Sequence, residues 1–175
     1  SQAHRRHWGA VAMNFRGCSG EPNRLRRSYH GGDTGDLAFV IARVQAERPS
    51  SPILCVGFSL GGNVLLKSLG EQGDALPEQV RAAVAISAPV DLSRSAHALE
   101  HGFSRVYMHR LVQSLKRKTF EKLRRYPDLV DAKALRAVRS SGSTSAVSIR
   151  YCQSGVVRLF LVSNAHSDPG KGMSE

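Results

Sequence analysis

The stretch ILCVGFSLGGNVLLKSL, residues Ile53 to Leu69, decides the fold of this chain. Its first part, Ile53 to Val56, is a short apolar run that predicts a buried β-strand. The glycine-rich segment Gly57 to Gly62 then predicts a tight turn, and Asn63 to Leu69 predict a helix that ends at Gly70. The sequence therefore predicts a strand, a sharp turn and a helix in direct succession.

The turn has the spacing Gly-x-Ser-x-Gly, with Ser59 at its centre. A serine between a buried strand and a helix is held in strained backbone geometry with its hydroxyl exposed, which is typical of a catalytic nucleophile. Gly57 and Gly61 leave room for the turn, and Gly62 lets the helix pack closely. The amide of Leu60 is placed to stabilise an oxyanion at the helix N-terminus. The alternative is that Ser59 is an ordinary helix N-cap.

Further apolar runs flank this unit. Ala10 to Phe15 and Val80 to Ser87 both predict buried strands, and Leu37 to Arg48 carries apolar residues at helical spacing. Asp33 to Asp36 precede that helix and offer its N-cap candidates. Strands that alternate with helices are typical of a parallel sheet with crossover helices, so we expect the α/β class.

The pattern changes after Asp91. Between Arg94 and Arg139 the chain holds twelve Lys or Arg residues and four Asp or Glu residues, with apolar residues at helical spacing. We therefore expect four parts along the chain. These are a core over residues 1–92, a cap of short basic helices over 93–139 that sits on the sheet, a linker over 140–155, and a returning strand (Val156 to Val162) with a turn over 156–175.

The formal net charge is +11, and the basic helical segment supplies most of the excess. Such a face attracts nucleic acid, anionic lipid or an acidic substrate, and the alternative is a solvated helical surface. Aromatic residues are sparse there and no nucleic-acid-binding motif occurs. We therefore expect no specific nucleic acid partner and only a weak contact with an anionic membrane surface.

The three cysteines, Cys18, Cys55 and Cys152, form no pair with CxxC spacing. A disulfide framework or a zinc site is therefore not expected, and a reducing cytoplasmic location is favoured. No His/Cys cluster has ligand spacing, and Gly57 to Gly62 lacks the Lys-Ser/Thr of a phosphate-binding loop. We expect no metal and no organic cofactor. No apolar run is long enough to span a membrane.

Longer stretches resemble the YheT-like branch of the α/β-hydrolases, the bacterial relatives of the abhydrolase-domain lipases and esterases. They are Met13 to Arg24, Tyr29 to Thr34, Gly57 to Asn63, Ser87 to Leu92 and Gly102 to Tyr107. The resemblance implies a doubly wound, mostly parallel sheet with a helical cap. It also implies hydrolysis of a small-molecule or lipid ester by a Ser, Asp, His triad. Ser59 is then the nucleophile and the Leu60 amide is one oxyanion donor.

The chain departs from the family pattern at both ends. Family members carry a second oxyanion donor on an N-terminal His-Gly loop, and no such loop precedes Ala10, so we expect an incomplete chain. The family's acid follows a strand in a turn that often contains Asp-Pro, which makes Asp168 the candidate acid; its alternative is a plain turn aspartate. No histidine follows Asp168, where the base is expected. The seven histidines of the chain are His4, His7, His30, His97, His101, His109 and His166.

The sequence thus predicts a serine carboxylic-ester hydrolase without a triad histidine in place. One alternative is a module that binds anionic surfaces through its basic segment. Another is a non-catalytic hydrolase remnant, whose exposed apolar surface would favour aggregation. The apolar cap residues Phe103, Val106, Tyr107 and Met108 suit either an acyl-chain pocket or ordinary packing. The ester, its acyl length and the oligomeric state are left open by the sequence.

Overall fold

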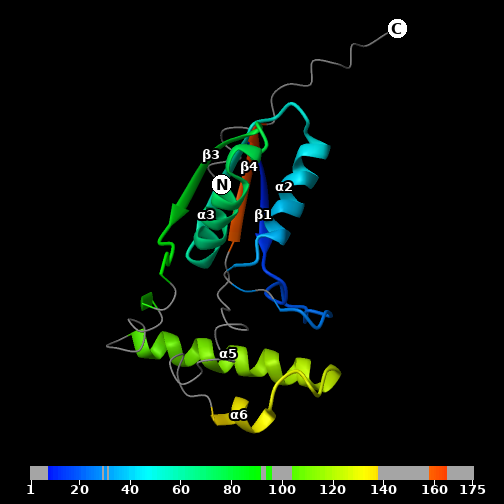
Figure 1. The fold of residues 1–175 in the computed structure, drawn as a ribbon, viewed down its shortest axis with the longest axis vertical. Helices are drawn as coiled ribbons and strands as arrows, with labels where there is room; N and C mark the ends of the chain where they lie inside the picture. The colour runs from blue at the N-terminus through cyan, green and yellow to red at the C-terminus, as the bar shows by residue number, and fades with distance from the viewer. Residues whose placement is uncertain are drawn as a thin grey trace.

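The computed structural model describes residues 8–28, 30, 32–91, 94–95, 104–137 and 158–164. Strands and helices alternate through the first half of the chain, which confirms the α/β class (Figure 1). The elements are β1 (Trp8–Asn14), α2 (Gly35–Glu47), β2 (Ile53–Phe58), α3 (Leu60–Gln72), the 3-10 turn η1 (Gly73–Ala75), β3 (Val80–Ile86), α5 (Ser104–Arg125), α6 (Ala132–Ala137) and β4 (Arg158–Asn164).

The four strands form one sheet in the order β1-β4-β2-β3. β2 and β3 are parallel, whereas β4 is antiparallel to both β1 and β2. Because β4 opposes both of its neighbours, β1, β2 and β3 all run in the same direction. Their carboxyl ends therefore meet at one side of the sheet, here called the carboxyl edge, where Ser59 follows β2.

The hydrophobic core lies on one face of this sheet. It joins buried residues of α2 and α3 to alternate residues of β2 and to the end of β1. Leu37, Ile53, Leu65, Val64 and Cys55 are its largest fully buried side chains. The strand alternation of β2 explains this, because Ile53 and Cys55 point to the face that the two helices cover.

The predicted burial is right for β2 and wrong for β1 and β3. Most residues of β1 and β3 are exposed, including Val11 at 41% and Val84 at 50%. Both strands lie at the edges of the sheet, and α2 and α3 pack on one face only. Apolar runs in the sequence show which residues suit a buried strand, but not how many neighbours cover it.

Two predicted helix limits also differ from the structure. α3 continues through Gly70 to Gln72 and ends at Gly73, whose positive φ of 47° suits a glycine at a helix end. At the start of α2, Thr34 takes the N-cap position, but its side chain makes no cap hydrogen bond. The Thr34 hydroxyl instead donates to Glu71 of α3, and the carboxylate of Asp33 accepts from Arg27.

The basic segment forms one long helix and one short helix, rather than the predicted run of short ones. α5 has 22 residues and contacts α6, and Val112, Leu115 and Leu135 are buried on the two helices. In Figure 1 the pair lies beyond the carboxyl edge and not across a face of the sheet. No helix among the described residues is both long and apolar enough to cross a membrane. The linker predicted over 140–155 lies outside the described residues.

Candidate active site

Ser59 lies at the carboxyl edge, between the end of β2 and the start of α3. Its backbone has φ 51° and ψ −122°, a conformation that side-chain-bearing residues rarely adopt. Its N–H donates to the carbonyl of Ile86 at 2.8 Å, and its own carbonyl accepts from Gly62 at 2.9 Å and from Asn63 at 3.2 Å. The side chain is exposed and makes no cap hydrogen bond, although Ser59 takes the N-cap position of α3.

The neighbouring glycines are required by close backbone contacts. A Cβ on Gly57 would lie 2.5 Å from the carbonyl oxygen of Gly61 and 2.7 Å from the Cα of Gly62. A Cβ on Gly62 would lie 2.9 Å from the Cβ of Ala88 and 3.1 Å from the carbonyl oxygen of Gly57. Gly57, Gly61 and Gly62 are all buried. The turn can therefore be this tight only because Gly57 and Gly62 carry no side chains.

The loop after β3 supports the turn in a way that the sequence motif did not indicate. The Asn63 side chain donates to the carbonyl of Pro89 at 3.0 Å, which ties the start of α3 to this loop. Ser87 also has a positive φ of 51°, the same value as Ser59. Two serines at the ends of adjacent parallel strands thus share an unusual backbone angle. The only sequence signal for this pairing is the Ser-Ala-Pro that ends the third apolar run.

The N–H of Leu60 lies at the N-terminus of α3, directly after Ser59. Leu60 is the first residue of α3, so its N–H has no acceptor within the helix. Among the described residues its N–H meets no acceptor elsewhere either. The Leu60 side chain is 3% exposed and belongs to the core, which fixes the backbone beside Ser59. An anion beside Ser59 would gain from this N–H and from the positive end of the helix dipole.

No described residue provides a base for Ser59. Two histidines fall in the described ranges, His30 in the loop after β1 and His109 exposed on α5. The Nδ1 atom of His30 accepts the N–H of Gly32 at 3.1 Å. A neutral His30 ring in this arrangement carries its proton on Nε2, so neither nitrogen is free to accept the proton of a serine. Within the described chain no hydrogen bond joins the Ser59 hydroxyl to a histidine or a carboxylate.

The direction of β4 decides at which side of the sheet this strand ends, before the predicted acid Asp168. The predicted strand at Val156 to Val162 is found two residues later, and Asn164 at its end pairs with Trp8 at the start of β1. β4 therefore ends at the side of the sheet opposite the carboxyl edge, where Ser59 lies. Asp168 itself lies outside the described residues, so its role stays a prediction.

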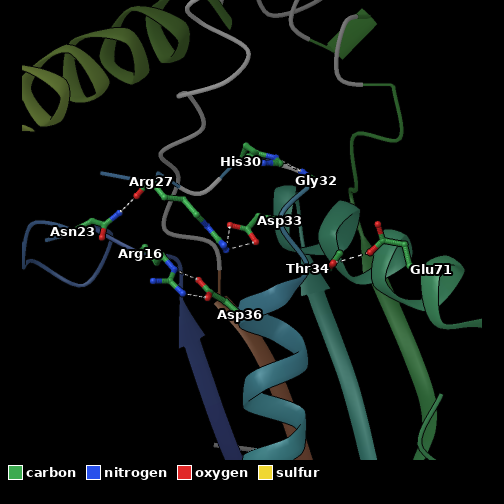
Figure 2. A network of polar contacts seen from close by, with 9 residues as sticks. All are labelled: Arg16, Asn23, Arg27, His30, Gly32, Asp33, Thr34, Asp36 and Glu71. Atoms are coloured by element: carbon green, nitrogen blue, oxygen red, sulfur yellow. Dashed lines mark hydrogen bonds and ion pairs between the residues drawn. The ribbon is translucent and has the colours of Figure 1, made fainter. Parts of the chain in front are cut away.

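A polar network holds the loop between β1 and α2 at the carboxyl edge (Figure 2). Arg16 and Asp36 form a two-point ion pair in which Nε donates at 2.6 Å, and Arg27 donates to both oxygens of Asp33 at 2.8 Å. The hydrogen bond to Asp36 raises the pKa of Arg16, so this guanidinium stays charged at any physiological pH. The Thr34 hydroxyl donates to Glu71 at 2.7 Å, which links the loop to α3.

The two described cysteines differ in their surroundings. Cys55 is 1% exposed in the core, and burial raises the pKa of its thiol from 9.0 to about 11, so it is an unreactive structural residue. Cys18 is half-buried in the loop after β1, and the Nζ of Lys118 lies 3.5 Å from its sulfur. No group of three or more metal-ligating side chains occurs within the part of the chain that the structure describes.

Comparisons with known proteins agree with this geometry. The family described by the α/β-hydrolase fold matches residues 2–145. The chain is 44% identical over 142 residues to YheT of Escherichia coli (strain K12), which is named as an esterase; the match covers 78% of this chain and 41% of YheT. No solved structure matches.

Two eukaryotic relatives match shorter stretches. Human phospholipase ABHD3 is 38% identical over 76 residues, 43% of this chain and 19% of that protein. The monoacylglycerol lipase of Saccharomyces cerevisiae (strain ATCC 204508 / S288c) is 31% identical over 88 residues, 50% of this chain and 19% of that protein. The chain thus spans about two-fifths of YheT and about one-fifth of the other two.

Proposed function

Because the chain belongs to the α/β-hydrolase fold family, we propose that it is a serine carboxylic-ester hydrolase with Ser59 as its nucleophile. The observation that carries the proposal is the backbone of Ser59. Its φ of 51° places an exposed hydroxyl at a sharp strand-to-helix turn, with no cap hydrogen bond to occupy it. A plain N-cap serine has extended backbone geometry and a side chain bonded to the helix, and Ser59 has neither.

The proposed reaction begins when Ser59 Oγ attacks the carbonyl carbon of an ester and loses its proton to a base. The carbonyl oxygen becomes an oxyanion, which the N–H of Leu60 stabilises. The tetrahedral intermediate then collapses, the alcohol leaves with a proton from the base, and an acyl-serine remains. Water activated by the same base attacks this ester, which releases the acid and restores Ser59.

The proposed reaction also requires a base and an acid, and no described residue provides either of them. The base is a histidine outside the described residues or outside this chain, since His30 is engaged through Nδ1 with Gly32 and no described hydrogen bond joins His109 to Ser59. Asp168 remains the acid proposed from the sequence. Losing any triad member typically lowers kcat by several orders of magnitude, so an unfilled base would leave Ser59 weakly reactive.

The names of the relatives support a proposal for the substrate class. One is named as an esterase, one as a phospholipase and one as a monoacylglycerol lipase. We propose a lipid or small-molecule ester as substrate, and no organic cofactor. Of the cap residues suggested for an acyl pocket, Val106 is 53% exposed on α5.

The test is labelling with a fluorophosphonate probe, followed by mapping of the adduct by mass spectrometry. We expect the adduct on Ser59, and we expect Ser59→Ala to abolish it. Ser87→Ala is the matched control, because Ser87 is exposed and has the same φ at the end of the adjacent strand. Labelling of the Ser87→Ala variant should equal that of the unaltered chain.

Two results would contradict the proposal. One is the absence of labelling in a chain that circular dichroism shows to be folded. The other is labelling that persists in Ser59→Ala. If labelling does occur at Ser59, Asp168→Asn tests the acid, because loss of a triad acid should slow labelling by orders of magnitude while leaving the melting temperature unchanged.

A further inference from the structure

A second site lies between α5 and the loop that follows β1. The cavity there has a volume of about 800 Å³ and is lined by residues of the loop 16–28, by α5 and by Leu129. Seven of its lining residues are Arg or Lys, and two are Glu. The seven are Arg16, Arg24, Arg117, Lys118, Lys122, Arg124 and Arg125. A cavity of this composition has a strongly positive interior.

Most of this positive charge is not neutralised within the described chain. Arg16 is paired with Asp36, but none of the five α5 cations in the cavity forms an ion pair with a described carboxylate. Lys118 and Lys122 are half-buried. Lys118 donates to the sulfur of Cys18 at 3.5 Å, and Lys122 donates to the hydroxyl of Ser28 at 2.6 Å. Neither partner is a carboxylate.

The half-burial of these two lysines distinguishes the cavity from an ordinary solvated helical surface. A solvated lysine points its ammonium into water, where charge costs little. Burial instead lowers the pKa of Lys122, which shows that its surroundings disfavour the positive charge. The partly closed space therefore holds two glutamates and six cations, and the six cations have no described carboxylate partner. An anion that enters this space would relieve their mutual repulsion.

We propose that this cavity binds a phosphate group. A phosphate carries up to two negative charges and accepts hydrogen bonds from both guanidinium and ammonium donors, and the cavity offers both. Nucleic acid fits less well, because single-stranded binding uses aromatic side chains as stacking platforms. None of the described residues that line the cavity is aromatic.

The position of the cavity suggests two sources for the phosphate. The loop 16–28 follows β1, so the cavity lies at the same carboxyl edge of the sheet as Ser59. The phosphate therefore belongs either to the head group of the ester substrate or to a free phosphate ligand. The first source rests on the proposed hydrolase function, whereas phosphate binding itself does not.

The binding test is isothermal titration calorimetry of the 175-residue chain with inorganic phosphate, at constant ionic strength set with chloride. We expect saturable binding, and we expect the double variant Lys118→Gln/Lys122→Gln to weaken it about tenfold or more, because each lost charged hydrogen bond costs that much. Arg110→Gln is the matched control, since Arg110 is exposed on the same helix outside the cavity.

A second variant and a second readout distinguish a loss of phosphate binding from misfolding. Arg124→Gln/Arg125→Gln changes two exposed residues that make no described contact, so the fold should survive while phosphate affinity falls. Cys18 also lines the cavity, and bound phosphate should slow its alkylation by an anionic thiol reagent. Equal binding by all variants, or no binding that exceeds the effect of chloride, would overturn the proposal.

The source is decided by kinetics with two substrates, a short-chain acyl ester of glycerol phosphate and the same ester without phosphate. If the head group is the ligand, the Lys118→Gln/Lys122→Gln variant should raise KM for the phosphorylated ester only. If KM is unchanged for both esters while calorimetry shows binding, the ligand is a free phosphate. Failure to hydrolyse either ester, together with no probe adduct on Ser59, contradicts the hydrolase function and leaves the calorimetric result standing. Binding that requires vesicles of anionic lipid would show a membrane contact and contradict the cavity site.

Discussion

At the residue scale, the turn at Ser59 is fixed by backbone atoms more than by side chains. Its N–H and carbonyl are both bonded, to Ile86 on one side and to Gly62 and Asn63 on the other. The strained φ of 51° is thus held by the surrounding chain. The glycines matter because a methyl group at Gly57 would meet the backbone of the next helical turn.

This contact predicts a contrast between two Gly→Ala variants on the same strand-turn-helix unit. Gly57→Ala should lower the free energy of unfolding by about 1–3 kcal/mol, since a Cβ there forces backbone atoms apart. Gly70→Ala should raise it by about 0.5–1 kcal/mol, because Gly70 lies inside α3 with open space around its Cα. Urea denaturation measures both. Equal changes in the free energy of unfolding for the two variants would show that the turn relaxes around the added methyl group.

At the element scale, the segment directly after α5 is tied to the loop after β1 by a small set of contacts. Arg26 forms a two-point ion pair with Asp128, at 3.0 and 2.8 Å, and its guanidinium lies 5.9 Å from the ring centre of Tyr126. The Tyr126 hydroxyl donates to the carbonyl of Arg24 at 3.0 Å. These contacts are mostly exposed, so they position α5 over the loop more than they stabilise the fold.

Breaking this set should loosen the loop and leave the core intact. We expect Tyr126→Phe/Asp128→Asn to increase hydrogen exchange of the amides from Arg24 to Ser28, with no change in α3. The ion pair with Arg26 also lowers the pKa of Asp128, so its contribution persists above the ordinary carboxyl value and is lost as pH falls through the lowered pKa.

Lys133→Gln serves as the comparison for this exchange experiment, since Lys133 is exposed on α6 away from the loop. Unchanged exchange of the loop amides in the double variant would mean that other contacts hold the loop. Those contacts would include the hydrogen bond from Lys122 to Ser28.

At the scale of the whole molecule, one face of the sheet is not covered by a described helix. The residues that alternate with the core positions of β2 and β3 point to this face, and they include Phe58 at 38%, Val84 at 50% and Ile86 at 40% exposure. An apolar face next to an edge strand is a surface for self-association.

Val84→Lys should therefore reduce concentration-dependent aggregation without lowering the melting temperature. A lysine on an edge strand opposes pairing with another chain, and Val84 contributes little to the core. Light scattering at increasing protein concentration measures the effect. Gln113→Lys adds the same charge at an exposed position of α5. An equal reduction of aggregation by both variants would show that net charge, and not this face of the sheet, controls aggregation.

The sequence by itself determined the strand-turn-helix unit that carries Ser59. Apolar runs, glycine spacing and the central serine are local features, and local backbone sterics act on them directly. The segments at β1, α2, β2, α3 and β3 were predicted for this reason, with errors of a few residues at their ends. Gly70 shows the limit, because a lone glycine does not end a helix whose packing continues beyond it.

Only the tertiary structure decided which of these strands are buried and where β4 lies. Burial depends on how many layers cover a strand, and β4 pairs antiparallel between β1 and β2, more than 90 positions from either in the sequence. The cavity between α5 and the loop 16–28 has the same origin, since α5 and the loop meet through contacts such as Lys122 to Ser28. A sequence gives the charge of each segment, but charges act together only where the fold places them side by side.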